Sequence, residues 1–205
     1  MLNQYLSIFR SAVLAGLAIS LGGIVYLKTN SDLTGAIMFS FGLLTVVHYH
    51  LMLYTGKAGF FKMKPKNSDT TSLDELFVPV LIGNAVGCLI AGAMCWISLP
   101  DVMSNAQALV EKRLDAGFLV NFTLAIPCGF IMTTAVEFGK NEKFLPLLFG
   151  VPLFIVCGFR HSIADAFYYC ASGLFSMELF WNWIFIVLGN FVGCNIYRTV
   201  MYKLI

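Results

Sequence analysis

The segment of the chain best equipped for chemistry is Cys-Gly-Phe-Arg-His-Ser-Ile-Ala-Asp at positions 157–165. It lies in the middle of an apolar stretch from about residue 144 to residue 175, which is long enough to cross a bilayer. Ionisable groups at membrane depth cost roughly 2.5 kcal/mol or more each, so they usually face a cavity or a partner. We therefore expect a broken helix that lines a pore, with His161 at its centre.

His161 could act on a weak acid, because a neutral imidazole has an unperturbed pKa of about 6.5 and can lend a hydrogen bond or a proton to an anion. The alternative is a histidine whose hydrogen bonds are made by backbone groups freed at the break. Thr-Gly-Lys-Ala-Gly at 55–59 interrupts a second apolar run. Lys57 and Arg160 lie beside the two breaks and would form an electropositive vestibule for anions. Pairing with an acid such as Asp165, or with open carbonyls, is the alternative.

Composition places the chain in a membrane. Its 205 residues are 59% hydrophobic and 12% charged, with a mean hydropathy of +0.81, against roughly 25% charged residues in a soluble domain. The net charge of +2 is too small and scattered to indicate a nucleic-acid partner. Arg10 is followed by a full-length apolar span, so we expect no cleavable signal peptide. The partner that the composition indicates is the lipid bilayer.

Six apolar spans are expected in a single domain over residues 1–205. They run from about 9 to 27, 35 to 54, 77 to 99, 117 to 136, 144 to 175 and 178 to 201. Residues 102–115 carry several charges and indicate an exposed loop with a helical turn or two. Lysine and arginine gather on one side of these spans, so the positive-inside rule places both termini in the cytoplasm.

The chain also repeats itself. Ile-Gly-Asn-Ala-Val-Gly-Cys at 82–88 matches Leu-Gly-Asn-Phe-Val-Gly-Cys at 188–194, an offset of 106 residues. Residues 17–22 match residues 124–129 at an offset of 107. Two matches at nearly one offset indicate an internal duplication.

Each repeat holds three spans, so the two repeats, over about 8–100 and 115–205, must lie in opposite orientations. In inverted repeats of this kind the interrupted helices meet near the bilayer midplane. The offset of 106 carries Thr55 onto His161. We therefore expect the two breaks to be symmetry mates whose side chains approach each other across the pore.

The repeated Gly-Asn-x-x-Gly segments place small residues four apart on one helix face, which lets helices approach closely in lipid. Pore lining is the alternative. Six cysteines lie within apolar spans without the close pairing of a metal or redox motif, so we expect reduced, buried packing cysteines. We expect neither a metal nor a cofactor.

These residues resemble the formate/nitrite transporter family, which includes formate, nitrite and hydrosulfide channels. The motifs that carry the resemblance are Leu-Tyr-Thr-Gly at 53–56, Gly-Phe-Arg-His-Ser-Ile-Ala at 158–164 and the Gly-Asn pairs that begin at 83 and 189. The resemblance implies an aquaporin-like, all-α membrane protein with six transmembrane helices in two inverted three-helix repeats, whose second and fifth helices are broken. It also implies a homopentamer with one pore per protomer, in the plasma (inner) membrane of a bacterium.

The resemblance further implies roles for individual residues. Thr55 and His161 would form the central polar pair, and Asn121 falls where the family has a pore asparagine. The apolar constrictions would be formed on one side by Phe39, Leu43 and Phe154, and near the other gate by Leu53 and Tyr54.

Three positions depart from the family pattern. Arg160 stands where a glutamate usually precedes the pore histidine, and Asp165 stands where an asparagine is usual. Asn105 lies near the expected position of a lysine that polarises the histidine region. Arg160 or Lys57 could supply the missing charge. These departures leave the expected fold intact and bear on the substrate.

We therefore expect a channel or proton-coupled transporter for small monovalent anions or their neutral acids, of the formate, nitrite or hydrosulfide class, and not an enzyme. A bare anion crosses an apolar constriction at a far higher cost than its neutral acid. The expected steps are attraction by the basic rim, hydrogen bonding to Thr55 and His161, proton gain near the constriction, and release. The alternative is a pore for water or another small neutral solute on the same fold.

Overall fold

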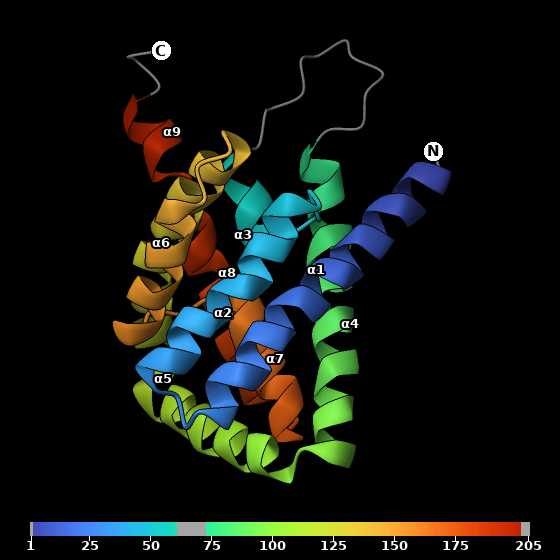
Figure 1. The fold of residues 1–205 in the computed structure, drawn as a ribbon, viewed down its shortest axis with the longest axis vertical. Coiled ribbons are helices and arrows are strands. Elements are labelled where there is room, and N and C mark those ends of the chain that lie inside the picture. Colours follow the sequence, from blue (N-terminus) through green and yellow to red (C-terminus); the bar gives the residue numbers. More distant parts are fainter. Residues whose placement is uncertain (1, 61–72, 202–205) are drawn as a thin grey trace.

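Every element in the described part of the chain is helical. The computed structural model describes residues 2–60 and 73–201 (Figure 1). Its elements are α1 (Leu2–Lys28), α2 (Leu33–His48), α3 (Tyr54–Lys57), the 3₁₀ helix η1 (Ala58–Phe60), α4 (Leu73–Ser98), α5 (Pro100–Lys140), α6 (Leu145–Val156), α7 (Ser162–Ser172), α8 (Met177–Cys194) and α9 (Ile196–Met201). The basic residues at 62–66, which contributed to the predicted orientation, lie outside the described residues.

Four helices of the described chain are long and apolar enough to cross a membrane, and they correspond to α1, α4, α5 and α8. α2 and α6 are apolar but shorter. Each of these two is followed by a non-helical stretch and then by another short helix. The interruptions predicted in the second and fifth apolar runs are therefore confirmed. The start of α1 and the end of α9 lie at the same end of the molecule (Figure 1).

The first interruption begins earlier than the sequence predicted. α2 ends at His48, residues 49–53 are non-helical, and Thr55 lies in α3 instead of in the break. The chain turns at His50, whose φ is +53°, and the Leu51 amide donates back to the Val46 carbonyl at 2.9 Å. Hydropathy could not reveal this turn, because apolar residues continue through it.

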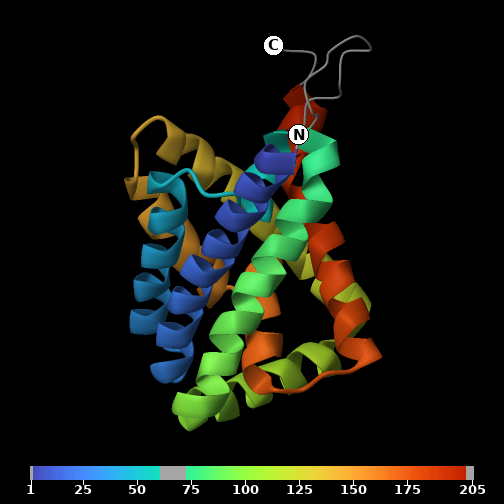
Figure 2. The same ribbon diagram turned by 90° about the vertical axis from the view of Figure 1, so that its right-hand side faces the viewer.

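The long helices pack in two pairs through glycine. α1 lies along α4 (Figure 2), and the second part of α5 lies along α8. A Cβ atom at Gly87 would collide with the backbone of Val13 in α1, and one at Gly193 would collide with the backbone of Ile126 in α5. Only glycine permits such close approach of two helices. Helix packing, the expected role of the repeated glycines, is confirmed.

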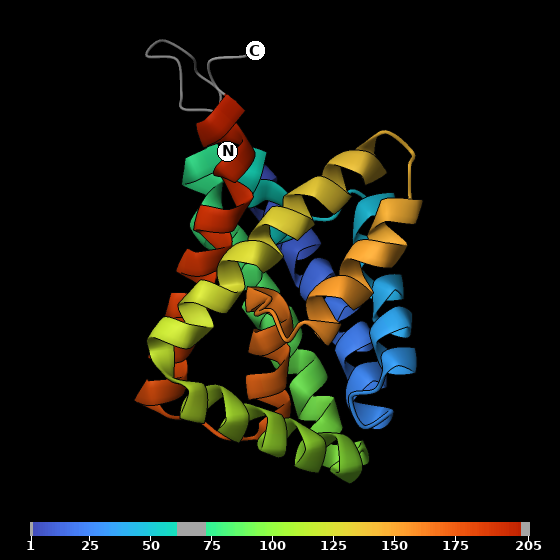
Figure 3. The same cartoon turned by 90° about the vertical axis from the view of Figure 1, so that its left-hand side faces the viewer.

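Residues 102–115 are helical, so the prediction of an exposed loop was wrong. They form the first part of α5, which crosses the lower end of the molecule before the chain turns and runs back along α8 (Figure 3). The turn is at Gly117, whose φ of +77° glycine adopts without strain. Val102, Ala106 and Val110 are fully buried, and their spacing of four places them on one helix face. The charges on the remaining positions concealed this amphipathic helix.

The six cysteines are free thiols. Four of them are buried and Cys170 is half-buried, but Cys157 is exposed. The prediction of buried packing cysteines was therefore wrong for Cys157. The reason is that Cys157 directly follows α6, where the chain leaves the helix and turns through Gly158, whose φ is +68°.

Candidate functional site

An asparagine of the repeated Gly-Asn motif holds the first interruption. Asn84 of α4 accepts a hydrogen bond on Oδ1 from the Tyr54 amide at 2.9 Å. Its Nδ2 donates to the carbonyls of Ala12 at 2.8 Å and Met52 at 2.9 Å. The side chain thus satisfies backbone groups that the broken helix leaves open, which matters because lipid offers them no partner.

The second interruption is held in the same way. Asn190 of α8 accepts from the Ser162 amide at 2.7 Å and donates to the carbonyls of Arg160 and Ala125, both at 2.8 Å. The sequence analysis assigned these motifs to glycine packing and missed the role of their asparagines. The signal was present, since the same polar residue recurs in two apolar helices.

These bonds correct the predicted register between the two breaks. The chain separation between the bound amide and its asparagine is 30 residues in the first half and 28 in the second. The offset of 106 therefore holds for the asparagines but becomes 108 at the breaks. By this count His161 corresponds to Leu53, and each is the N-cap residue of the short helix after it. Thr55 is not the symmetry mate of His161.

Thr55 and His161 nevertheless meet. Thr55 Oγ1 lies 2.9 Å from His161 Nε2, and both residues are fully buried. The Ala164 amide donates to His161 Nδ1 at 3.1 Å, which caps α7. Because Nδ1 is an acceptor, the hydrogen of the neutral ring is assigned to Nε2, which donates to the Thr55 hydroxyl. The hydroxyl hydrogen of Thr55 is then available for a ligand.

Large apolar side chains lie beside this polar pair. The ring of Phe154 stacks on the ring of His161 with centroids 5.5 Å apart, and the ring of Phe39 meets Phe154 edge-on at 6.3 Å. Leu43 and Leu53 are fully buried as well. On the side of these residues the pair has apolar surroundings, where a hydrogen bond is stronger than in water.

Tyr54 is buried but is directed toward other helices. Its hydroxyl donates to the Val187 carbonyl of α8 at 2.9 Å, and its ring lies edge-on to Phe77 of α4 at 4.7 Å. These contacts fix the first turn of α3 and hence the position of Thr55. The predicted place of Tyr54 at a gate stays a prediction.

Arg160 is tied to the second break and does not pair with Asp165. Its Nε donates to Asn121 Oδ1 at 2.7 Å and its Nη1 donates to the Gly158 carbonyl at 2.5 Å. Asn121 in turn donates to the Arg113 carbonyl at 2.5 Å. Pairing with an open carbonyl, one of the two alternatives for Arg160, is therefore observed. Its role in a vestibule stays a prediction, as does that of Lys57, which is half-buried at the end of α3.

Asp165 pairs instead with Arg113, a residue that the sequence analysis placed in an exposed loop. Arg113 Nε lies 2.9 Å from Asp165 Oδ1, and the two side chains are 11% and 1% exposed. Both line a cavity of about 20 Å³ together with His161 and Phe154. Among the described residues, Asn121 does not line this cavity. The buried stripe of α5 could have revealed Arg113, which lies three positions beyond Val110 on that helix.

A family model described as formate/nitrite transporter matches residues 2–204. The chain belongs to the formate/nitrite transporter family. The formate channel FocA of Haemophilus influenzae is 25% identical over 222 residues, which cover 96% of this chain and 78% of that protein. FocA of Escherichia coli is 25% identical over 184 residues, 79% of this chain and 65% of its own length. The solved structure of a "Pentameric formate channel with formate bound" is 23% identical, with a TM-score of 0.84 over 98% of this chain and 97% of that one.

The sequence analysis expected a family lysine near position 105, where this chain has an asparagine. Asn105, near the position of that lysine, donates to the Leu27 carbonyl at 2.9 Å and to Asn30 Oδ1 at 3.2 Å. It joins α5 to the turn after α1. Among the described residues, Arg113 is the cation that lines the cavity at His161. That Arg160 or Lys57 replaces the charge of the lysine stays a prediction.

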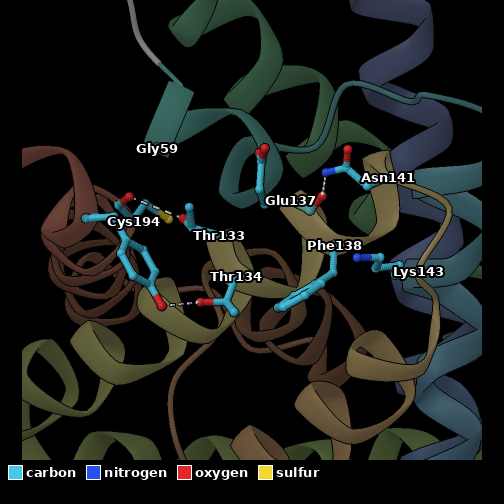
Figure 4. A pocket seen from close by; sticks show the side chains of 9 residues that line it. Gly59, Thr133, Thr134, Glu137, Phe138, Asn141, Lys143 and Cys194 are labelled. Carbon is cyan, nitrogen blue, oxygen red and sulfur yellow. Dashed lines mark hydrogen bonds between the residues drawn. The ribbon is translucent and has the colours of Figure 1, made fainter. Parts of the chain in front are cut away.

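The family member has a second, larger cavity of about 740 Å³ between the second part of α5 and the end of α8 (Figure 4). Several polar groups that line it form hydrogen bonds with one another. Thr133 donates to the Cys194 carbonyl at 3.2 Å, and the Thr134 hydroxyl bonds to Tyr197 at 3.3 Å. Its lining within the described chain includes none of the predicted site residues, so it is separate from the site at His161.

Proposed function

We propose that this protein is a channel or proton-coupled transporter for small monovalent anions of the formate, nitrite or hydrosulfide class, with His161 as its central pore residue. The observation that carries the proposal is the Thr55–His161 hydrogen bond where two interrupted helices meet. It places a hydroxyl and an imidazole beside buried aromatic rings. The match to the transporter family and the names of the FocA relatives support the same class of substrate.

The geometry suits an anion that must be partly desolvated. The Thr55 hydroxyl donates to the anion, and the Nε2–H of His161 polarises that hydroxyl by donating to its oxygen. A second hydrogen on His161 Nδ1 would face the Ala164 N–H and break the cap of α7. His161 is therefore a hydrogen-bond donor that stays neutral. An anion that gains a proton here passes the rings of Phe39 and Phe154 as a neutral acid, which avoids most of the desolvation cost.

The proposal extends to the architecture. The matching bonds of Asn84 and Asn190 support two inverted three-helix repeats of the aquaporin-like kind, over about 8–100 and 115–205. Assembly as a homopentamer is supported by the similar solved structure, which is that of a pentameric formate channel. We place the protein in a bacterial inner membrane with both termini in the cytoplasm, consistent with the start of α1 and the end of α9 lying at one end.

The remaining site residues complete the proposal. Thr55, His161 and Asn121 form or support the pore. Lys57 and Arg160 attract anions. The constrictions are formed by Phe39, Leu43, Phe154, Leu53 and Tyr54, all of them buried.

Flux of formate, nitrite and hydrosulfide into proteoliposomes tests the function. Thr55→Val removes the hydroxyl but keeps the shape of the side chain, and we expect flux to fall about tenfold or more, the value of one hydrogen bond to a charged group. His161→Asn, which can still cap α7, should lower flux similarly. Thr134→Val in the larger cavity is the matched control and should leave flux unchanged. Undiminished flux in both site variants, or fast water permeation without anion flux, would overturn the proposal.

A further inference from the structure

We propose that Asp165, and not His161, holds the proton that the permeating anion receives. The inference rests on the proposed transport function and identifies the proton donor of the same site. Asp165 departs from the family pattern, because the resemblance predicts an asparagine at this position. The structural basis is a buried carboxylate with one hydrogen-bonded oxygen and one oxygen without a hydrogen-bond partner among the described residues.

The two oxygens of Asp165 have different surroundings. Oδ1 accepts from Arg113 Nε at 2.9 Å, whereas Oδ2 is buried without a hydrogen-bond partner among the described residues. A buried charged oxygen without a partner is unfavourable, so such an atom indicates a proton or a ligand. Asp165 lines the cavity at His161, whose volume of about 20 Å³ accommodates one water molecule. That water would connect Oδ2 to a solute beside His161.

The other groups of the cavity are poor proton donors. His161 uses Nδ1 to cap α7 and Nε2 to bond Thr55, so it cannot take up a proton without losing the cap. Tyr26 and Tyr168 also line the cavity, but phenols hold their protons far more tightly than carboxylic acids do. Among the described residues that line it, Asp165 is the carboxyl group.

The ion pair makes proton transfer and anion binding depend on each other. When Asp165 is protonated, the charge of Arg113 is uncompensated and attracts an anion to the place beside His161. The proton on Oδ2 then passes through the water to the anion: the O–H bond of the side chain breaks, the O–H or S–H bond of the neutral acid forms, and the electron pair stays on the carboxylate. The Arg113–Asp165 pair is now neutral, so the neutral acid leaves. A proton from the more acidic side restores the protonated state.

The titratable groups that face Asp165 come from several helices. Arg113 of α5, Tyr26 of α1, Tyr168 of α7 and its cap residue His161 line the cavity with Asp165. Cys128 of α5 and Tyr169 of α7 interact with Asp165 electrostatically. On the α4 side, Cys88 donates to the carbonyl of Ile163. Arg113 is the group of opposite charge in this set, so it decides the charge of the cavity in each protonation state.

Infrared difference spectroscopy between neutral and acidic pH tests whether Asp165 takes up a proton. In vesicles without substrate we expect a carbonyl band of a protonated carboxyl in the wild type, and its loss in Asp165→Asn. Asp101→Asn removes an exposed acid that pairs with Lys28 and is the matched control, which should keep the band. Addition of formate at acidic pH should weaken the wild-type band. A band that Asp165→Asn leaves unchanged would overturn the proposal.

Simultaneous measurement of formate uptake and internal acidification tests the transfer. In Asp165→Asn we expect protons taken up per formate to fall about tenfold or more, within the range that a positioned proton donor contributes. Asp165→Glu keeps a carboxyl and should keep the coupling, which separates proton transfer from misfolding. Unchanged coupling in Asp165→Asn contradicts the inference. A wild type that transports none of the three anions contradicts the proposed function itself, even if the infrared band shows that Asp165 titrates.

Discussion

The two interrupted helices are held by the same bonds but differ in the short helix beyond the break. In each, one asparagine accepts from an amide and donates to two carbonyls. After the first break α3 has 4 residues, and its N-cap residue Leu53 makes no side-chain hydrogen bond. After the second, α7 has 11 residues and is capped by the His161 side chain. The shared asparagines hold both breaks, and the residues that differ include those to which we assign the proposed transport chemistry.

The charged residues of the described chain are also distributed unequally between the two breaks. The second break carries Arg160, is followed by Asp165 and is faced by Arg113, whereas the first contributes the hydroxyl of Thr55. The asparagines that hold the breaks thus occur at both of them, whereas the buried Arg113–Asp165 pair lies at the second break. Four predictions test this division.

The ion pair should give the largest effect, because it has no counterpart at the first break. Arg113→Leu leaves the buried carboxylate of Asp165 unpaired, so we expect a loss of about 3–5 kcal/mol in unfolding free energy. The double variant Arg113→Leu/Asp165→Leu should recover most of that loss. Denaturant unfolding of the detergent-solubilised protein measures both. If the single variant is as stable as the wild type, the pair does not stabilise the second break.

The two asparagines should come next and should be equal. Asn84→Leu and Asn190→Leu each leave buried amide and carbonyl groups unsatisfied, and we expect each to cost about 2–4 kcal/mol. The same unfolding assay compares them directly. A difference of more than about 2 kcal/mol would mean that the two breaks are not held alike.

The N-cap formed by His161 should contribute less to the unfolding free energy than either asparagine does. His161→Ala removes the acceptor for the Ala164 amide, whereas His161→Asn keeps a side-chain acceptor at the N-cap. We expect the alanine variant to be less stable than the asparagine variant by about 1 kcal/mol. Both should lose anion flux. Equal stability of the two variants would show that capping by His161 contributes little.

The smallest effect on stability is expected from substitution at the N-termini of α2 and α6. Asp32 caps α2 by accepting from the Gly35 amide at 2.7 Å, whereas Phe144 gives α6 no side-chain cap. Bonds from Gly35 and Thr29 lower the pKa of Asp32 below its ordinary 3.8. A carboxyl with a lowered folded pKa stabilises the protein above the unfolded value, and this is lost as pH falls through the folded value.

Melting temperatures between neutral and acidic pH measure this contribution. We expect the wild type to lose a small part of its stability below pH about 4, and Asp32→Ala to lack that part at every pH. The two proteins should therefore converge at the acidic end. A constant difference across the whole range would show that Asp32 acts through something other than its charge.

The sequence predicted most reliably where a polar residue interrupts an apolar run. His161 is conspicuous at membrane depth, and the break before α7 lies where it was expected. The break after α2 was misplaced because Leu51, Met52 and Leu53 remain apolar although the helix has ended. Hydropathy reports burial in lipid or protein, and it does not report backbone conformation.

Other errors concern pairs of residues that lie far apart in the sequence. Counting at one offset aligned Thr55 with His161, because counting cannot detect that the two halves differ by two residues between break and asparagine. The charge of Arg113 was interpreted as a sign of exposure, yet the helix it belongs to returns it to the interior. Ion pairs between residues 52 positions apart depend on packing, which no local pattern specifies.

The bend at Gly117 has an evolutionary consequence. Arg113 reaches the cavity from the crosswise part of α5, whereas the glycine contacts that hold α5 to α8 lie beyond the bend. Replacement of Arg113 would therefore leave the glycine contacts between α5 and α8 in place, although it would unpair Asp165. If the proposed transport function holds, evolution can change the charge at the cavity by a route that does not involve the helix–helix contacts.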